Sequence, residues 1–324
     1  MKVAAVLGLY ALLLALLPAR FLARAGWAGR SPRWGVALWQ ALSASALLAA
    51  AAAGFALALP ALRLSGDLSQ VLRECVMALR AQYASPGGAL TAASGAVLAM
   101  TVLGSAAWCV SRELFTAAAA RRVHRGLLRL TARPYDGAHT GAADPLVVQH
   151  DSLSAYCLPG RGGRIVLTSA ALDALEPDEL DAVLAHERAH LAGRHHLVLA
   201  AANGLARAFW FVPLFAIARE QTAVLVEMLA DDRASRNGKP LIVAEALLRL
   251  AAPPGHPRPI PAVALGATAA ATGDRIRRLL ADRGPIGSGG KALAAAGSSL
   301  LLAGPVLVLL TPALALANSP YCPA

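Results

Sequence analysis

Four long runs of apolar residues constrain the fold of this chain more than any other feature. The runs are Val3–Pro18, Val36–Leu62, Ala89–Val110 and Ala292–Ala317. The first extends to Leu22 if Arg20 reaches toward the headgroups. A helix needs about 20 predominantly apolar residues to cross a bilayer. Only 15% of the 324 residues are charged, whereas about 25% are charged in a typical soluble domain. We therefore predict a mainly α-helical integral membrane protein with about four transmembrane helices.

The formal net charge of +11 is concentrated next to these runs. Basic clusters follow the first run (Arg20–Arg33), follow the third (Arg112–Arg129) and precede the fourth (Arg275–Lys291). Loops rich in Arg and Lys stay in the cytoplasm, so we expect a multi-pass protein of the cell membrane whose central region is cytoplasmic. No aromatic residues alternate with the basic ones, so we expect the lipid bilayer, and not nucleic acid, as the partner of this charge.

These boundaries predict three parts. Residues 1–111 form a three-helix transmembrane region, 112–290 a cytoplasmic domain, and 291–324 a last transmembrane helix with a short extracellular tail. A cleaved signal peptide is the alternative for the first run, but it would require Arg30 and Arg33 to be exported, so we favour an uncleaved anchor. Cys75 and Cys322 both fall on the outer side, and the sequence leaves open whether they pair. It is also compatible with a homo-oligomer without requiring one.

The central region combines short strands with helices. Residues 131–144 are rich in Gly, Pro and Asp and predict a loop. Ala155–Leu158 and Arg164–Leu167 flank a Gly-rich turn and predict a pair of strands, after a weaker strand at Leu146–His150. A longer helix is predicted from Pro177, because Pro at the first helical position and acids in the first turn are helix-start signals.

The sequence His186-Glu187-Arg188-Ala189-His190 lies on that helix. Side chains four residues apart point the same way, so His186 and His190 can bind one metal ion together. Glu187 falls on the apolar face of the helix, where a carboxylate needs a specific role. The HExxH pattern supplies one, because its glutamate acts as the general base of a zinc protease. We therefore predict one Zn²⁺ ion, with His186 and His190 as ligands and Glu187 as the catalytic residue.

A catalytic zinc site has three protein ligands and an open position. Downstream, Glu227 and Asp231 stand four residues apart on an apolar helical stretch. We predict that Glu227 is the third ligand and that Asp231 accepts a hydrogen bond from a ligand histidine; the alternative is a solvated helix face. His195 is expected to be a cation at the end of the motif helix, and Arg233 either an ion-pair partner or an oxyanion stabiliser. For His196, hydrogen-bond donation in the transition state is an open alternative to the same helix-end role as His195.

Leu197–Ile217 is a further apolar segment, interrupted by Asn203, Arg207 and Pro213. If it crossed the bilayer once, His190 and Glu227 would lie on opposite sides and would not share a metal ion. We therefore predict a membrane-associated helix at about 197–217 that is interfacial, re-entrant or packed under the catalytic site.

A peptide substrate is expected to add as a strand along Ser154, Ala155, Tyr156 and Cys157, because this stretch directly precedes the motif helix. An ordinary core strand is an equally good interpretation of the same residues.

The motifs at residues 155–169, 184–191 and 227–231 resemble those of the BlaR/MecR family of membrane metallopeptidases. The resemblance implies a gluzincin-like α+β zinc protease domain, zinc at His186, His190 and Glu227, and regulated cleavage of a cytoplasmic protein such as a transcriptional repressor. It does not extend to a penicillin-binding sensor domain. The alternatives are an HtpX-like quality-control protease, which shares the two motifs, and a non-proteolytic membrane signalling protein.

Overall fold

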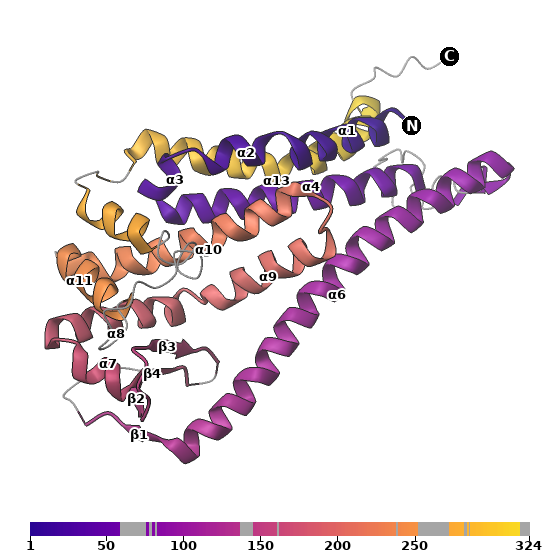
Figure 1. The fold of residues 1–324 in the computed structure, drawn as a ribbon. Helices are drawn as coiled ribbons and strands as arrows, with labels where there is room; N and C mark the ends of the chain where they lie inside the picture. Colours follow the sequence, from indigo (N-terminus) through magenta and orange to yellow (C-terminus); the bar gives the residue numbers. More distant parts are fainter. Residues whose placement is uncertain are drawn as a thin grey trace.

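The fold is described from a computed structural model (Figure 1). It describes residues 1–58, 76–77, 80–81, 83–136, 145–160, 162–237, 239–251, 272–281, 284 and 286–317. Cys75 and Cys322 lie outside the described residues, so the question of their pairing does too.

Four helices are long and apolar enough to cross a membrane, as the sequence predicts. They are α1 (Lys2–Leu16) continued by α2 (Pro18–Ala23), α4 (Pro32–Ala58), α6 (Pro86–Thr131) and α13 (Ser288–Ala317). Only 6% of the most apolar window of α13 and 18% of that of α1–α2 are buried inside the protein. Apolar surface on this scale is typical of membrane association.

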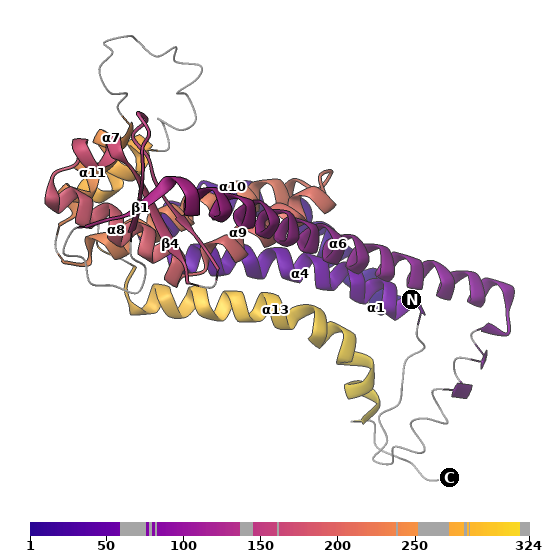
Figure 2. The same cartoon turned by 90° about the horizontal axis from the view of Figure 1, so that it is seen from below.

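Helix α4 lies between α6 and α13 (Figure 2). It approaches α6 closely at Gly54 and Gly95, where a Cβ on either residue would collide with the backbone of the other helix. Small residues at such crossings let helices pack tightly within a membrane. On its other side, Ser45 donates a hydrogen bond to the Leu301 carbonyl (2.6 Å) and bonds with the Tyr10 hydroxyl (3.1 Å). These polar contacts tie α1, α4 and α13 together.

Helix α6 continues far beyond the predicted run at Ala89–Val110. It has 46 residues, which is about 69 Å at 1.5 Å per residue, roughly twice the thickness of a bilayer core. Its second half carries the chain from the candidate membrane-spanning helices to the small sheet (Figure 1). The charges after Val110 mark where an apolar surface ends, but a helix needs no apolar surface to continue.

The sheet has four strands in the order β1-β2-β4-β3. They are β1 (Ala132–Pro134), β2 (Pro145–Val148), β3 (Ala155–Leu158) and β4 (Arg164–Thr168). Strands β3 and β4 form the predicted pair and run antiparallel, and β2 runs parallel to β4. Strand β1 lies in a segment for which we predicted only a loop. The loop prediction was wrong there, because the end of α6 aligns Ala132 and Arg133 beside β2.

Between the sheet and residue 251, the structure describes five helices and a 3₁₀ turn. They are α7 (Ser169–Ala174), α8 (Pro177–Ala192), α9 (His195–Ala208), α10 (Pro213–Ala234), η1 (Ser235–Asn237) and α11 (Pro240–Ala251). Residues 272–280 are also helical. Helix α8 packs Leu180, Val183 and Leu184 on one face of β4, while Leu128 of α6 packs against Val166 on the other face. The sheet is therefore held between α8 and the end of α6.

Leu197–Ile217 is not one continuous helix. Helices α9 and α10 occupy it as a hairpin whose turn is Phe209–Val212 (Figure 1). The break is local, because Pro213 is the first residue of α10 and the residue before a proline disfavours helical backbone. The hairpin returns the chain to the same end of the molecule, which is what a metal site shared by α8 and α10 requires.

Candidate metal centre

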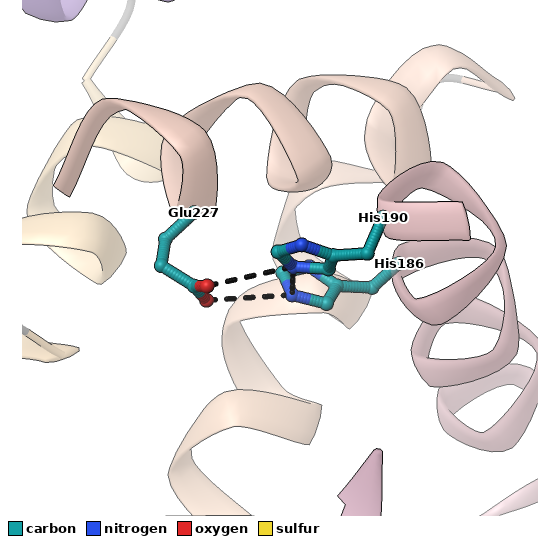
Figure 3. Close-up of side chains that lie close together, drawn as sticks. All are labelled: His186, His190 and Glu227. Carbon is teal, nitrogen blue, oxygen red and sulfur yellow. Dashed lines mark hydrogen bonds and ion pairs between the residues drawn. The ribbon is translucent and has the colours of Figure 1, made fainter. Parts of the chain in front are cut away.

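Helix α8 begins as the sequence predicts. Pro177 is its first residue, and Glu176 and Glu179 form a reciprocal capping box with the backbone. This fixes the start of the helix and therefore the direction in which every later side chain points. His186 and His190, one turn apart, both face α10 across the gap between the helices (Figure 3).

Three ligand atoms converge between α8 and α10. The Nε2 atoms of His186 and His190 are 3.1 Å apart, and each lies 3.5 Å from one carboxylate oxygen of Glu227 (Figure 3). One ligand atom from each residue falls within 4.8 Å of the others. The structure thus brings together the three side chains that the sequence predicts as ligands.

These distances fit a zinc ion. Zinc bonds to histidine nitrogen at about 2.0–2.1 Å in tetrahedral geometry, so neighbouring ligand atoms should be about 3.3 Å apart. The observed separations of 3.1 and 3.5 Å bracket that value. The Nδ1 atoms of His186 and His190 lie beside Asp231 and His195. The Nε2 atoms of both histidines and the carboxylate of Glu227 therefore face one point. Only a cation or shared protons make such an arrangement favourable.

Asp231 is fully buried beside His186, where we predicted the hydrogen-bond acceptor of a ligand histidine. Its Oδ1 atom lies 3.0 Å from His186 Nδ1. Burial alone would lower the pKa of His186, but the contacts with Asp231 and Glu227 outweigh it and raise that pKa to about 9. An imidazole held this way has a fixed orientation and points Nε2 at the metal position.

Arg275 completes the centre, and no sequence pattern indicated this role. We interpreted Arg275 only as part of the basic cluster before the last helix. Its guanidinium instead forms two hydrogen bonds with Asp231, of 2.8 and 2.7 Å, and an ion pair with Glu227 at 3.2 Å. Burial raises the pKa of both acids, but Arg275 and His186 outweigh it, so both pKa values are lowered and both groups are anionic. Arg275 lies 44 positions after Asp231. No helical or motif spacing connects residues so far apart, so the sequence could not indicate this contact.

His195 is not a cation at a helix end. It is the first residue of α9 and only 4% exposed. Its Nδ1 atom lies 3.0 Å from His190 Nδ1. Burial and nearby positive charges lower the pKa of His195, so the neutral ring can accept a hydrogen bond from His190 Nδ1 and orient that imidazole. Gly193 permits this approach, since a Cβ there would collide with the imidazole.

Glu187 faces the edge strand β3. Burial raises the pKa of its carboxyl group, although the positive charge of His186 and a hydrogen bond from the Cys157 thiol oppose that shift. The pKa of Cys157 is itself raised to about 12 by burial and by Glu187, so the thiol stays protonated and donates. A carboxylate with an elevated pKa beside two candidate ligands suits proton transfer near neutral pH.

Ser154 and strand β3 lie at the edge of the sheet. In the part of the chain that the structure describes, β3 pairs only with β4, so its second edge is available for a further strand. Tyr156 points to the other face and bonds through its hydroxyl to His124 Nε2 at 2.7 Å. Ala155 and Cys157 instead pack on the α8 side. Of the four residues predicted to bind substrate, Cys157 contacts Glu187, whereas the Tyr156 side chain faces away from it.

Arg233 and His196 are farther from the ligand atoms. The Arg233 guanidinium donates to the Ala189 carbonyl at 3.4 Å, which joins α10 to α8 and favours a structural role. His196 is the second residue of α9 and is half-buried, and it is not part of the group of possible ligands found among the described residues.

Comparison with known proteins gives one match. Residues 117–252, which are less than half of the chain, match the family model of Peptidase family M48. No curated protein and no solved structure matches. The matched stretch includes the sheet, α8 and Glu227, and peptidases of this family are generally zinc-dependent. The match supports a membrane zinc metallopeptidase without confirming the BlaR/MecR type or the gluzincin fold. Residues 117–252 are therefore similar to Peptidase family M48, and the chain joins them to helices apolar enough to associate with a membrane.

Proposed function

We propose that the protein is a membrane-embedded zinc endopeptidase that cleaves a cytoplasmic protein. The observation that carries the proposal is the convergence of His186, His190 and Glu227 on one point, with Glu187 beside it. A purely structural zinc site has no use for an adjacent base. This favours an enzyme over a non-proteolytic signalling protein.

The residues of this chain have distinct roles in the proposed reaction. His186, His190 and Glu227 hold the zinc ion, which when bound supplies Lewis-acid polarisation of the scissile carbonyl and acidifies water. Glu187 accepts the proton of the attacking water at its carboxylate and then passes it to the leaving amine. Asp231, Arg275 and His195 keep the two imidazoles in place.

The free edge of β3 is the proposed substrate site. An extended peptide added to Ser154–Leu158 would bond through its main chain and place a carbonyl near Glu187. Main-chain hydrogen bonds tolerate many peptide sequences. The choice of target therefore depends on which proteins can reach the edge of β3. In the proposed topology the domain is cytoplasmic, and a regulatory protein such as a repressor is the target class that the BlaR/MecR resemblance favours.

Replacing Glu187 with Gln tests the proposal. Removal of a general base slows a reaction by roughly 10²–10⁴-fold, while the three ligands should still bind one zinc per chain. Glu220→Gln is the matched control, because Glu220 is exposed on α10. Zinc is measured by mass spectrometry of the purified protein, and substrates by proteomics of strains that carry each variant.

A protein that accumulates only in the Glu187→Gln strain is a substrate. A single regulator would support regulated signalling, whereas a broad set of membrane proteins would support quality control. If both variants leave the same cleavage products as the native enzyme, the proposed mechanism is wrong.

A further inference from the structure

The turn between α9 and α10 carries an aromatic cluster with two different environments. Phe209 and Phe215 are buried, 9% and 5% exposed, with ring centroids 5.0 Å apart. Trp210 and Phe211 between them are 79% and 66% exposed. Two adjacent aromatic side chains at a hairpin tip, uncovered by the described residues, form an apolar surface suited to contact with an apolar partner.

The tip lies beside the apolar runs of two candidate membrane spans. Phe209 and Phe215 pack with Ala106 and Val102 of α6 and with Leu47 of α4. These contacts place the tip within the helices that the sequence assigns to the bilayer, and not beside the sheet (Figure 1).

The depth of the tip can be measured along both helices. Val102 stands eight residues before Val110, the last residue of its uncharged run, which is about 12 Å at 1.5 Å per residue. Leu47 stands eleven residues after Val36, the first residue of the other run, or about 16 Å. Both values are close to half of a hydrocarbon core of about 30 Å.

The charged residues of the hairpin are arranged for this depth. Arg207, next to the tip, is paired with Glu113 at 3.1 Å. Glu113 follows the uncharged run of α6, whereas Gly204 of α9 packs directly on Val110. The Arg207 side chain therefore extends back toward the end of the run, as long basic side chains do near an interface. Arg219 and Glu220 lie farther from the tip and pair with each other at 3.5 Å.

We propose that the α9–α10 hairpin is a re-entrant element whose Trp210–Phe211 tip is bound in the hydrocarbon of the bilayer. Contacts at matching depths on α4 and α6 favour lipid over a soluble partner, because a soluble protein does not reach that level. Glu227 stands fourteen residues after Pro213 on α10, so the metal centre is held about 21 Å from the tip. The hairpin thus fixes the height of the centre above the membrane.

Tryptophan fluorescence of the full chain in phosphatidylcholine–phosphatidylglycerol vesicles tests this inference. The chain has five tryptophans, and the emission that Trp210→Phe removes is the emission of Trp210. We expect lipids brominated in the middle of their acyl chains to quench most of that emission, and aqueous iodide to leave it unchanged. The exposed position of Trp210 means that the variant should fold as the native chain does.

Trp210→Phe combined with Leu241→Trp is the matched control. Leu241 is 56% exposed on α11, away from the tip, and a tryptophan there should be quenched by iodide and not by the brominated lipid. Two results would overturn the proposal. Quenching of Trp210 by iodide alone would place the tip in water, and quenching by neither reagent would mean that protein, such as a second copy of the chain, covers it.

Discussion

Each of the two candidate ligand histidines is held by a different kind of partner. Asp231 bonds to His186, whereas a neutral His195 bonds to His190. The pKa values differ accordingly, about 9 for His186 and about 4 for His190, the latter lowered mainly by burial. One histidine therefore carries a proton at neutral pH when no metal is bound, and the other does not.

Asp231→Asn should weaken zinc binding by about 10–100-fold, which is typical when a hydrogen-bond partner of a metal ligand is replaced. The asparagine keeps the size of the side chain but removes the charge that holds His186 and Arg275. Zinc affinity is measured by competition with a fluorescent chelator. Asp232→Asn is the matched control, since Asp232 pairs with Arg278 away from the ligands. Equal zinc affinities for the two variants would show that Asp231 does not support metal binding.

Zinc binding should release about one proton near pH 7, because a ligand histidine binds metal only when it is deprotonated. His186, with its pKa of about 9, holds that proton below pH 9. Apparent affinity should therefore increase about tenfold per pH unit from pH 7 toward 9 and weaken as the pH falls. Calorimetry in buffers of different ionisation enthalpy counts the proton. Asp231→Asn should reduce the release, and binding without any proton release in the native chain contradicts the assignment.

At the scale of elements, prediction succeeded where local chemistry decides. Pro177 and its acids start α8, and the Gly-rich turn joins β3 to β4. It failed where a distant partner decides. Arg275 takes its role from Asp231 across 44 residues, and β1 forms only because β2 lies beside it. The turn at Phe209–Val212 was predictable only in part. Pro213 indicates a break in the helix, but it does not indicate the direction in which α10 runs.

The crossing of α4 and α6 offers a test at the same scale. Gly95→Val should destabilise the membrane bundle by roughly 1–3 kcal/mol, a typical cost of overpacking, because a Cβ there collides with Gly54 and Leu57. Gly104→Val is the same change on the same helix, and a Cβ at Gly104 meets nothing within 4 Å. Thermal unfolding in detergent micelles should therefore separate the two variants. Similar melting temperatures would show that the two helices do not cross at Gly95.

On the scale of the whole molecule, the segment before the last helix connects both halves. Arg275 binds two acids of the candidate metal centre, Glu227 and Asp231, whereas Arg278 bonds to Asp232 and to the carbonyl of Gly29 in α3 (Trp27–Arg30). Beyond it, the Ile286 amide donates to Ser31. The region of the candidate metal centre is thus joined to the candidate membrane-spanning helices by these contacts as well as through α6 (Figure 2). These contacts also mean that Arg275 and Arg278 serve the fold and not only the orientation in the membrane.

Orientation itself is the prediction that depends on the whole chain. The remaining basic clusters still flank one side of the four candidate spans, so the metal centre should face the cytoplasm. Leu241→Cys lies on α11, which packs against α8, and Tyr83→Cys lies just before the start of α6, and both introduce thiols at exposed positions. A membrane-impermeant maleimide applied to intact cells should label position 83 and spare position 241, and inverted vesicles should show the reverse. Mass spectrometry of each peptide separates these positions from the native cysteines, and labelling of position 241 in intact cells would place the catalytic domain outside.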